Sequence, residues 1–129
     1  MSLGRFVAMI GAMHSAPRTF DTTLWSALLD EEARGLEAQR KHVLEKAVAQ
    51  LRAYFQEVPV KSVYLTGAVI QEGRFTSRSD VDVAVEGLSG NYFRVLVDLE
   101  ERIGRGLDLI ELEECRFRSA IEMRGLRVI

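Results

Sequence analysis

The stretch Ser79–Val85, which reads Ser-Asp-Val-Asp-Val-Ala-Val, decides the fold of this chain. Its alternating valines are typical of a buried strand, which we expect to run from Val81 to Val85. Side chains alternate across a strand, so residues two apart point to the same side. The stretch therefore predicts a strand whose start brings two carboxylates, Asp80 and Asp82, close together.

Two further strands are predicted, one before and one after this stretch. Residues 60–65 are rich in β-branched and aromatic side chains and run into Thr66-Gly67-Ala68, as a turn from a strand to a helix would. Residues 107–112 form the third predicted strand, with Asp108 near its start. An acidic residue in an otherwise buried strand is costly without a partner. Placed beside the strand of Asp82, Asp108 would complete a cluster of three carboxylates.

Helices are predicted around these strands. Apolar residues recur at helical spacing up to Phe55, after a possible helix cap at Asp21 or Thr22. Asn91 opens a second helix, and a short helix near 117–123 precedes a final strand at 126–129. This order of helices and strands is typical of an α/β fold, in which helices cover at least one face of a sheet.

Both long helices carry apolar side chains at helical spacing. Gly35 falls within the first helix and could divide it into two. The apolar stripe of this helix would pack on the sheet, on a partner, or in a homodimer. The stripe of the first helix consists of Leu24, Leu28, Leu36, Val43, Ala47, Leu51 and Tyr54, and the apolar residues of the second are Phe93, Leu96, Val97, Leu99 and Ile103.

The length of 129 residues is that of one domain. We expect a flexible leader in residues 1–20 and a single domain in residues 21–129. Within this domain, a helical segment (21–57) precedes a catalytic-type core (58–129). We find no internal repeat, low-complexity segment or interdomain linker.

The composition excludes several classes of protein. The net charge of −2 argues against a broad, salt-driven surface for nucleic acids or anionic membranes. No apolar run approaches the roughly 20 residues that cross a bilayer. The single cysteine, Cys115, cannot form an intramolecular disulfide, and with two histidines the chain is a poor candidate for a structural zinc site. We therefore expect a cytoplasmic protein with no membrane partner.

The carboxylates indicate a site for a metal ion and a nucleotide. Like charges this close raise each other's pKa unless a cation lies between them, and magnesium prefers such oxygen ligands. Asp80, Asp82 and Asp108 could hold two magnesium ions, one activating an attacking hydroxyl and the other neutralising a leaving pyrophosphate. The turn at Gly67 would offer backbone amides to the phosphates. Taken singly, the Asp-x-Asp could be a solvated strand start and Gly67 an ordinary tight turn.

These motifs together resemble those of the minimal nucleotidyltransferases, a family within the DNA polymerase β-like superfamily. Leu65-Thr66-Gly67-Ala68 resembles the Gly-Ser motif of the family, Ser79–Val85 its Asp-x-Asp strand, and Leu107–Ile110 the strand of its third aspartate. The closing residues 121–129 are similar to its last helix and strand, so the resemblance covers roughly residues 58–129.

The resemblance implies a nucleotidyltransferase fold, a small mixed β-sheet flanked by helices, with the N-terminal helical segment as an addition. It also implies magnesium as cofactor, ATP as substrate, and catalytic and metal-binding roles for Asp80, Asp82 and Asp108. Members are commonly encoded beside a helical HEPN-type partner, which they neutralise as antitoxins. Some transfer AMP to a tyrosine of that toxin.

The sequence departs from the family pattern at positions that would bind the nucleotide. Ala68 stands where the family has serine, and Val69–Gly73 replaces an arginine-rich segment. Arg74 and Arg78 could supply displaced positive charge for the phosphates, although solvated loop arginines are equally common. The candidate nucleotide-binding residues are thus Thr66, Gly67, Ala68, Arg74, Arg78 and Ser79.

Two functions follow. The first is magnesium-dependent transfer of a nucleoside monophosphate, AMP from ATP, to a hydroxyl of a partner protein. The alternative is a catalytically degenerate binding module that neutralises a HEPN-type partner by contact. Transfer to a small molecule is a weaker third possibility, since the chain is short for an acceptor-binding domain of its own.

Overall fold

The computed structural model describes residues 22–129, so the predicted leader at 1–20 and a cap at Asp21 lie outside the described residues. The chain divides into two compact units between Glu31 and Glu32. In the first unit the structure describes residues 22–31, which are the first turns of helix α2 (Thr22–Tyr54). The second unit contains the rest of α2 and all other elements. No helix within residues 22–129 has the length and apolar character needed to span a membrane.

Helices and strands follow one another in the predicted order. Asn91 caps α3 as predicted, because its side-chain oxygen accepts a hydrogen bond of 3.0 Å from the amide of Arg94. After α2 the elements are β1 (Ser62–Thr66), the 3-10 helix η1 (Gly67–Ile70), β2 (Val81–Glu86), α3 (Tyr92–Ile103), β3 (Leu107–Glu111), the 3-10 helix η2 (Leu112–Glu114), α4 (Arg118–Arg124) and β4 (Leu126–Arg127).

The four strands form one mixed sheet in the order β3-β2-β1-β4. Strand β1 pairs antiparallel with β2 and β4, whereas β2 and β3 run parallel. The parallel pair requires a crossover, which α3 supplies. The predicted α/β fold with a small mixed sheet is confirmed.

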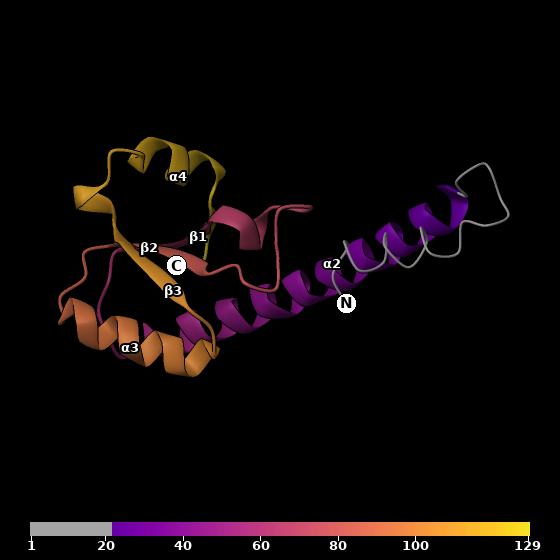
Figure 1. The fold of residues 1–129 in the computed structure, drawn as a ribbon. Helices are drawn as coiled ribbons and strands as arrows, with labels where there is room; N and C mark the ends of the chain where they lie inside the picture. Colours follow the sequence, from indigo (N-terminus) through magenta and orange to yellow (C-terminus); the bar gives the residue numbers. More distant parts are fainter. Residues whose placement is uncertain (1–21) are drawn as a thin grey trace, which may run out of the picture. The chain divides into compact units, whose positions relative to one another are not determined.

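Helices cover both faces of this sheet (Figure 1). On one face, α3 and the C-terminal part of α2 cover the main core, and on the other α4 covers a smaller cluster. Alternation along the strands explains the division, because Val63 and Leu65 lie in the main core while Tyr64 between them lies in the smaller one. The strand residues of the main core are Val63, Leu65, Val81, Val83, Val85, Leu107 and Leu109.

Helix α2 differs from the predicted pattern in two ways. It runs through Gly35 without a break, since the good helix formers around this residue offset the roughly 1 kcal/mol that glycine costs. Its buried positions are Val43, Ala47, Leu51 and Tyr54, which belong to its C-terminal half. Leu24 and Leu28 are 57% and 39% exposed, so the N-terminal part of the predicted stripe does not contribute to the core.

The apolar residues of α3 are divided between buried and exposed positions. Val95, Leu99 and Ile103 are buried, whereas Phe93 is 72% exposed and Val97 50% exposed. The periodicity identified the helix correctly. It could not choose which of two overlapping apolar stripes faces the sheet, because the choice depends on how α3 rotates as it packs.

Leu99→Ala should lower the free energy of unfolding by about 3 kcal/mol, because it leaves a cavity in the main core. Val97→Ala on the exposed side of the same helix should stay within about 0.5 kcal/mol of wild type. Urea denaturation of both variants measures the difference. Equal losses would contradict this orientation of α3 on the sheet.

Candidate active site

The three predicted carboxylates lie at the end of the sheet where β2 and β3 begin. Strand register places Asp82 opposite Asp108 on one side and opposite Thr66 on the other. Val81 and Val83 point into the main core, so Asp82 lies on the face of α4. Asp80 and Asp108 are exposed and Asp82 is half-buried. The structure thus confirms that Asp108 lies beside Asp82.

Two glycines make room for these carboxylates. Gly67 follows β1 in the left-handed region, with φ of 77°, and a Cβ there would overlap Oδ2 of Asp82. A Cβ at Gly106, just before β3, would lie 2.5 Å from Oδ1 of Asp80. Each carboxylate therefore lies against bare backbone, Asp82 beside the turn after β1 and Asp80 beside the segment that enters β3.

The electrostatic environment of Asp82 is unfavourable to its charge. Burial, repulsion by Asp108 and a hydrogen-bonding contact with Asp108 raise the pKa of Asp82 to about 6, and repulsion by Asp80 adds to this. Among residues 22–129, no lysine, arginine or histidine forms an ion pair with any of the three carboxylates. The cluster carries negative charge that its own described residues leave uncompensated.

Glu86, at the other end of β2 on the same face, shows the contrast. The guanidinium of Arg118 in α4 pairs with its carboxylate and, as the largest influence, lowers the pKa of Glu86. Arg118 also binds Glu122 at 2.7 Å within α4. One end of this face is thus neutralised by an arginine, while the end with Asp82 is not.

The fit of this cluster to a metal ion is partial. The carboxylate oxygens of Asp82 and Asp108 are the donors that magnesium prefers, and the two side chains are in contact. Within residues 22–129, however, no group of three or more His, Cys, Asp or Glu side chains could hold a metal ion as it stands. Asp80, which lies against Gly106, is the carboxylate that would have to approach the other two. The three-carboxylate metal site stays a prediction.

The predicted nucleotide-binding residues lie in two segments, the end of β1 with the turn after it and the loop before Asp80. Thr66 pairs with Asp82, and Ala68 follows half-buried in η1. Arg74 and Arg78 are exposed on the loop before Asp80, and neither forms an ion pair within the described part of the chain. They are therefore available to a ligand.

Ser79 is occupied within the loop. Its hydroxyl accepts a hydrogen bond of 2.9 Å from the amide of Thr76 and lies 3.2 Å from the hydroxyl of Thr76. It closes a turn, which is a structural role beside the predicted one.

Sequence reasoning missed Arg105. Its guanidinium donates to the backbone carbonyls of Thr76, Ser77 and Ser79, the loop that leads into Asp80. The signal available in the sequence was an arginine between two glycines, Gly104 and Gly106, shortly before Asp108. Such a position says nothing about a loop 26 to 29 residues away in the sequence.

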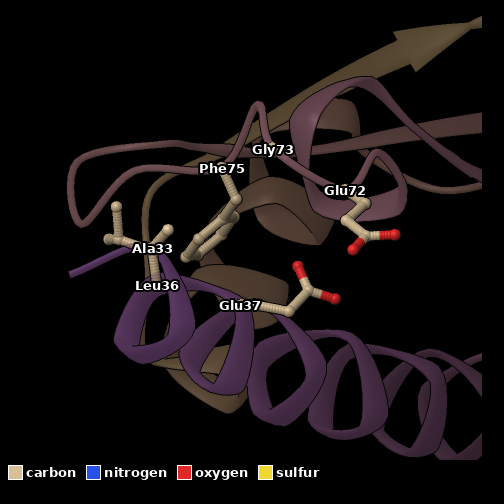
Figure 2. A pocket seen from close by; sticks show the side chains of 6 residues that line it. All are labelled: Ala33, Leu36, Glu37, Glu72, Gly73 and Phe75. Carbon is tan, nitrogen blue, oxygen red and sulfur yellow. The ribbon is translucent and has the colours of Figure 1, made fainter. Parts of the chain in front are cut away.

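A small pocket lies between α2 and the loop after η1, apart from the carboxylates. Its volume is about 180 Å³, below the roughly 300 Å³ of typical ligand pockets. Figure 2 shows Phe75 directed toward Ala33 and Leu36, with the carboxylates of Glu37 and Glu72 on the other side. Arg40 pairs with Glu37 at 2.6 Å. We assign this pocket no ligand.

Comparison with known proteins supports the fold. A chain of the toxin–antitoxin complex MntA-HpeT, crystallised as a mutant with two Asp-to-Glu substitutions, superposes with a TM-score of 0.52 and 16% sequence identity. The match covers 64% of this chain and 71% of that chain. This chain therefore shares its overall fold with that chain. No protein-family model and no curated protein sequence matches it.

The raised pKa of Asp82 predicts a pH-dependent stability. The folded pKa lies above the unfolded value of 3.8, so the metal-free protein loses stability as the pH rises from about 4 to about 6. Asp82→Asn removes this penalty and should be more stable than wild type at pH 7.5 by about 1 kcal/mol, a figure discounted for the solvent that reaches the half-buried carboxyl.

Urea denaturation in EDTA at pH 4 and pH 7.5 measures the effect. The advantage of Asp82→Asn should become much smaller at pH 4, where the wild-type carboxyl is protonated in the folded state and only partly ionised in the unfolded state. An advantage independent of pH would show that charge is not its cause.

Gly67→Ala and Gly73→Ala form a matched pair. Both glycines have positive φ, 77° and 82°, so both variants should lose roughly 1 kcal/mol from backbone strain. Only at Gly67 would the new Cβ meet Asp82, since nothing lies within 4 Å of a Cβ at Gly73. NMR titration should therefore show a shifted pKa of Asp82 in Gly67→Ala alone. The same pKa in both variants would contradict the close approach of Gly67 to Asp82.

Proposed function

We propose that this protein is a magnesium-dependent nucleotidyltransferase that moves AMP from ATP to a hydroxyl of a partner protein, in an antitoxin-like role. The observation that carries the proposal is the contact of Asp82 and Asp108 at the end of the sheet beside Gly67, without a compensating cation among residues 22–129. Perturbed carboxylates of this kind are typical of functional sites. The likeness to a chain of a toxin–antitoxin complex supports the proposed biological role.

Each candidate residue would have its own role in binding magnesium or the phosphates. Asp80, Asp82 and Asp108 would hold magnesium through carboxylate oxygens. Magnesium, when bound, would lower the pKa of the attacking hydroxyl and stabilise the leaving pyrophosphate. Because Gly67 has no side chain, the phosphates could approach the backbone of the turn closely.

Two arginines near the carboxylates in sequence are candidates to bind the negatively charged phosphates of ATP. Arg74 and Arg78 are exposed in the loop before Asp80 and could reach the triphosphate in place of the missing serine hydroxyl at Ala68. Losing one hydroxyl contact costs on the order of 1 kcal/mol, which weakens nucleotide binding without removing it.

The transfer step balances without any further reactant. The acceptor hydroxyl oxygen would form a bond to the α-phosphorus of ATP while the bond from that phosphorus to the bridging oxygen breaks and pyrophosphate leaves. Asp108 would accept the hydroxyl proton. Its exposed position at the start of β3 would let an acceptor on another protein reach it.

The second candidate function is a binding module that neutralises its partner by contact alone. Two observations favour it: Ala68 replaces the family serine, and the described residues contain no ready-made group of three metal ligands. This module would need neither ATP nor magnesium. Its complex would survive loss of all three carboxylates.

Calorimetric titration of ATP separates the two functions. Wild type should bind ATP in the presence of magnesium and much more weakly in EDTA. The double variant Asp80→Ala, Asp82→Ala should lose the magnesium-dependent part. Glu101→Gln, an exposed carboxylate on α3, is the control and should bind as wild type does.

The transfer itself is measured with ATP labelled at the α-phosphate and the protein encoded by the neighbouring gene. Label and the mass of one AMP should be added to that protein by wild type and not by Asp82→Asn or Asp108→Asn. A complex that forms without ATP, unaffected by the carboxylate variants and free of any adduct, would overturn transfer in favour of contact.

A further inference from the structure

Helix α3 carries an apolar stripe on the side that faces away from the sheet. Phe93 and Val97 are 72% and 50% exposed, while Val95, Leu99 and Ile103 are buried in the main core. Residues four apart lie on the same face of a helix, so Phe93 and Val97 form one continuous stripe. Figure 1 shows α3 on the side of the sheet opposite α4. The stripe is thus largely uncovered.

The ring of Phe93 is held in position although it is exposed. It lies edge-on against the ring of Tyr92, with ring centroids 5.3 Å apart and an interplanar angle of 87°. The hydroxyl of Tyr92 in turn donates to the carbonyl of Leu109 in β3. An aromatic ring that is already held loses little conformational freedom on binding, which suits a residue that anchors an interface.

Charged residues of opposite sign flank this stripe at its two ends. Arg94 lies in the first turn of α3 and Glu101 in the last turn, and both are exposed. The helix macrodipole favours the reverse arrangement, with anions at the N-terminus and cations at the C-terminus. Within residues 22–129, Arg94 has one ion pair, of 3.6 Å to Asp98, and Glu101 has none. The other cation of the last turn, Arg102, lies over the ring of Tyr54 at 5.1 Å.

A second copy of the same helix, packed antiparallel, would match this pattern. A two-fold axis beside Val97 would place Arg94 of each copy opposite the partner's Glu101, since the two residues lie about equally far from the axis. Val97 would meet the partner's Val97. Phe93 would reach the partner's Gly104, which is exposed and has no side chain in the way. Each charge would also lie at the end of the partner's helix whose dipole attracts it.

We propose that α3 is the contact surface of a homodimer, in which two copies of the helix pack antiparallel through Phe93 and Val97 and exchange two ion pairs between Arg94 and Glu101. One face of a 12-residue helix buries less than the roughly 1,000 Å² of a stable interface. The dimer is therefore weak and reversible, with a dissociation constant on the order of 100 µM.

The dimer would leave both candidate active sites open. Asp82 lies on the face of the sheet that α4 covers, whereas α3 covers the other face. The inference therefore stands independently of the proposed function, and loss of the dimer should not change the binding of ATP.

Sedimentation equilibrium of the wild-type protein at roughly 5 to 500 µM tests for the dimer. The average mass should rise across this range from that of a monomer toward that of a dimer. Neither ATP nor magnesium is present, so the result does not depend on the proposed transfer. A monomer at every concentration would overturn the proposal.

Charge reversal tests whether α3 forms the contact. Arg94→Glu and Glu101→Arg should each weaken the dimer at least about tenfold, because two pairs of like charges replace the two ion pairs. An equimolar mixture of these variants should dimerise again, since the charges of one complement those of the other across the two-fold axis. The double variant Arg94→Glu, Glu101→Arg should dimerise by itself.

Arg116→Glu is the matched control for these variants. It changes the net charge by the same amount as Arg94→Glu, at an exposed position just before α4, and should dimerise as wild type does. Glu101→Arg leaves the ion pair of Arg94 with Asp98 intact, so it keeps the test open if Arg94→Glu does not fold. Dimers of Glu101→Arg as strong as those of wild type, or a mixture of the two folded variants that stays monomeric, would overturn the contact through α3.

Discussion

Asp82 and Asp108 occupy paired positions in two parallel strands, so their carboxylates meet as soon as the sheet forms. The strand register that brings these carboxylates together cannot change easily, because a shift by one residue would turn the valines of β2 away from the main core. Burial of those valines therefore holds the two carboxylates together against their mutual repulsion. Gly67 completes the arrangement by leaving space for Asp82 where any side chain would intrude.

The carboxylates at the two ends of the sheet face covered by α4 lie in different electrostatic environments. At Glu86 the acid is matched by Arg118, and α4 is fastened to the sheet by that pair. At Asp82 there is no such match within residues 22–129, and Arg105, which follows α3 close to Asp80, donates its N–H groups to backbone carbonyls instead. Arg105 thus holds the loop that leads into Asp80 and leaves the charge of the carboxylates unpaired within residues 22–129.

Much of this could be predicted from the sequence, and the limits have physical causes. Alternation in β2 indicated the strand and its two neighbouring carboxylates, because these follow from local periodicity. Asp108 was expected beside them only if its strand lay next to β2, and the register shows that it does. The exposure of Phe93 and the unbroken course of α2 through Gly35 could not be predicted, since they depend on tertiary packing and on small propensity differences. Arg105 was missed for the same reason, as its partners lie far away in sequence.

The unpaired carboxylates also bear on the choice between the two functions. A surface that works by contact alone does not require two like charges in contact, and a neutral polar side chain at this position would avoid the electrostatic cost that raises the pKa of Asp82 to about 6. In natural proteins, unfavourable arrangements such as like charges in contact usually occur at functional sites. In the proposed function, Ala68 would remove one hydroxyl contact to the nucleotide, whereas the carboxylates would lie at the reacting centre. Keeping the carboxylates in contact costs more free energy than losing one hydroxyl contact. This cost favours a site that uses the charge of the carboxylates to hold a cation.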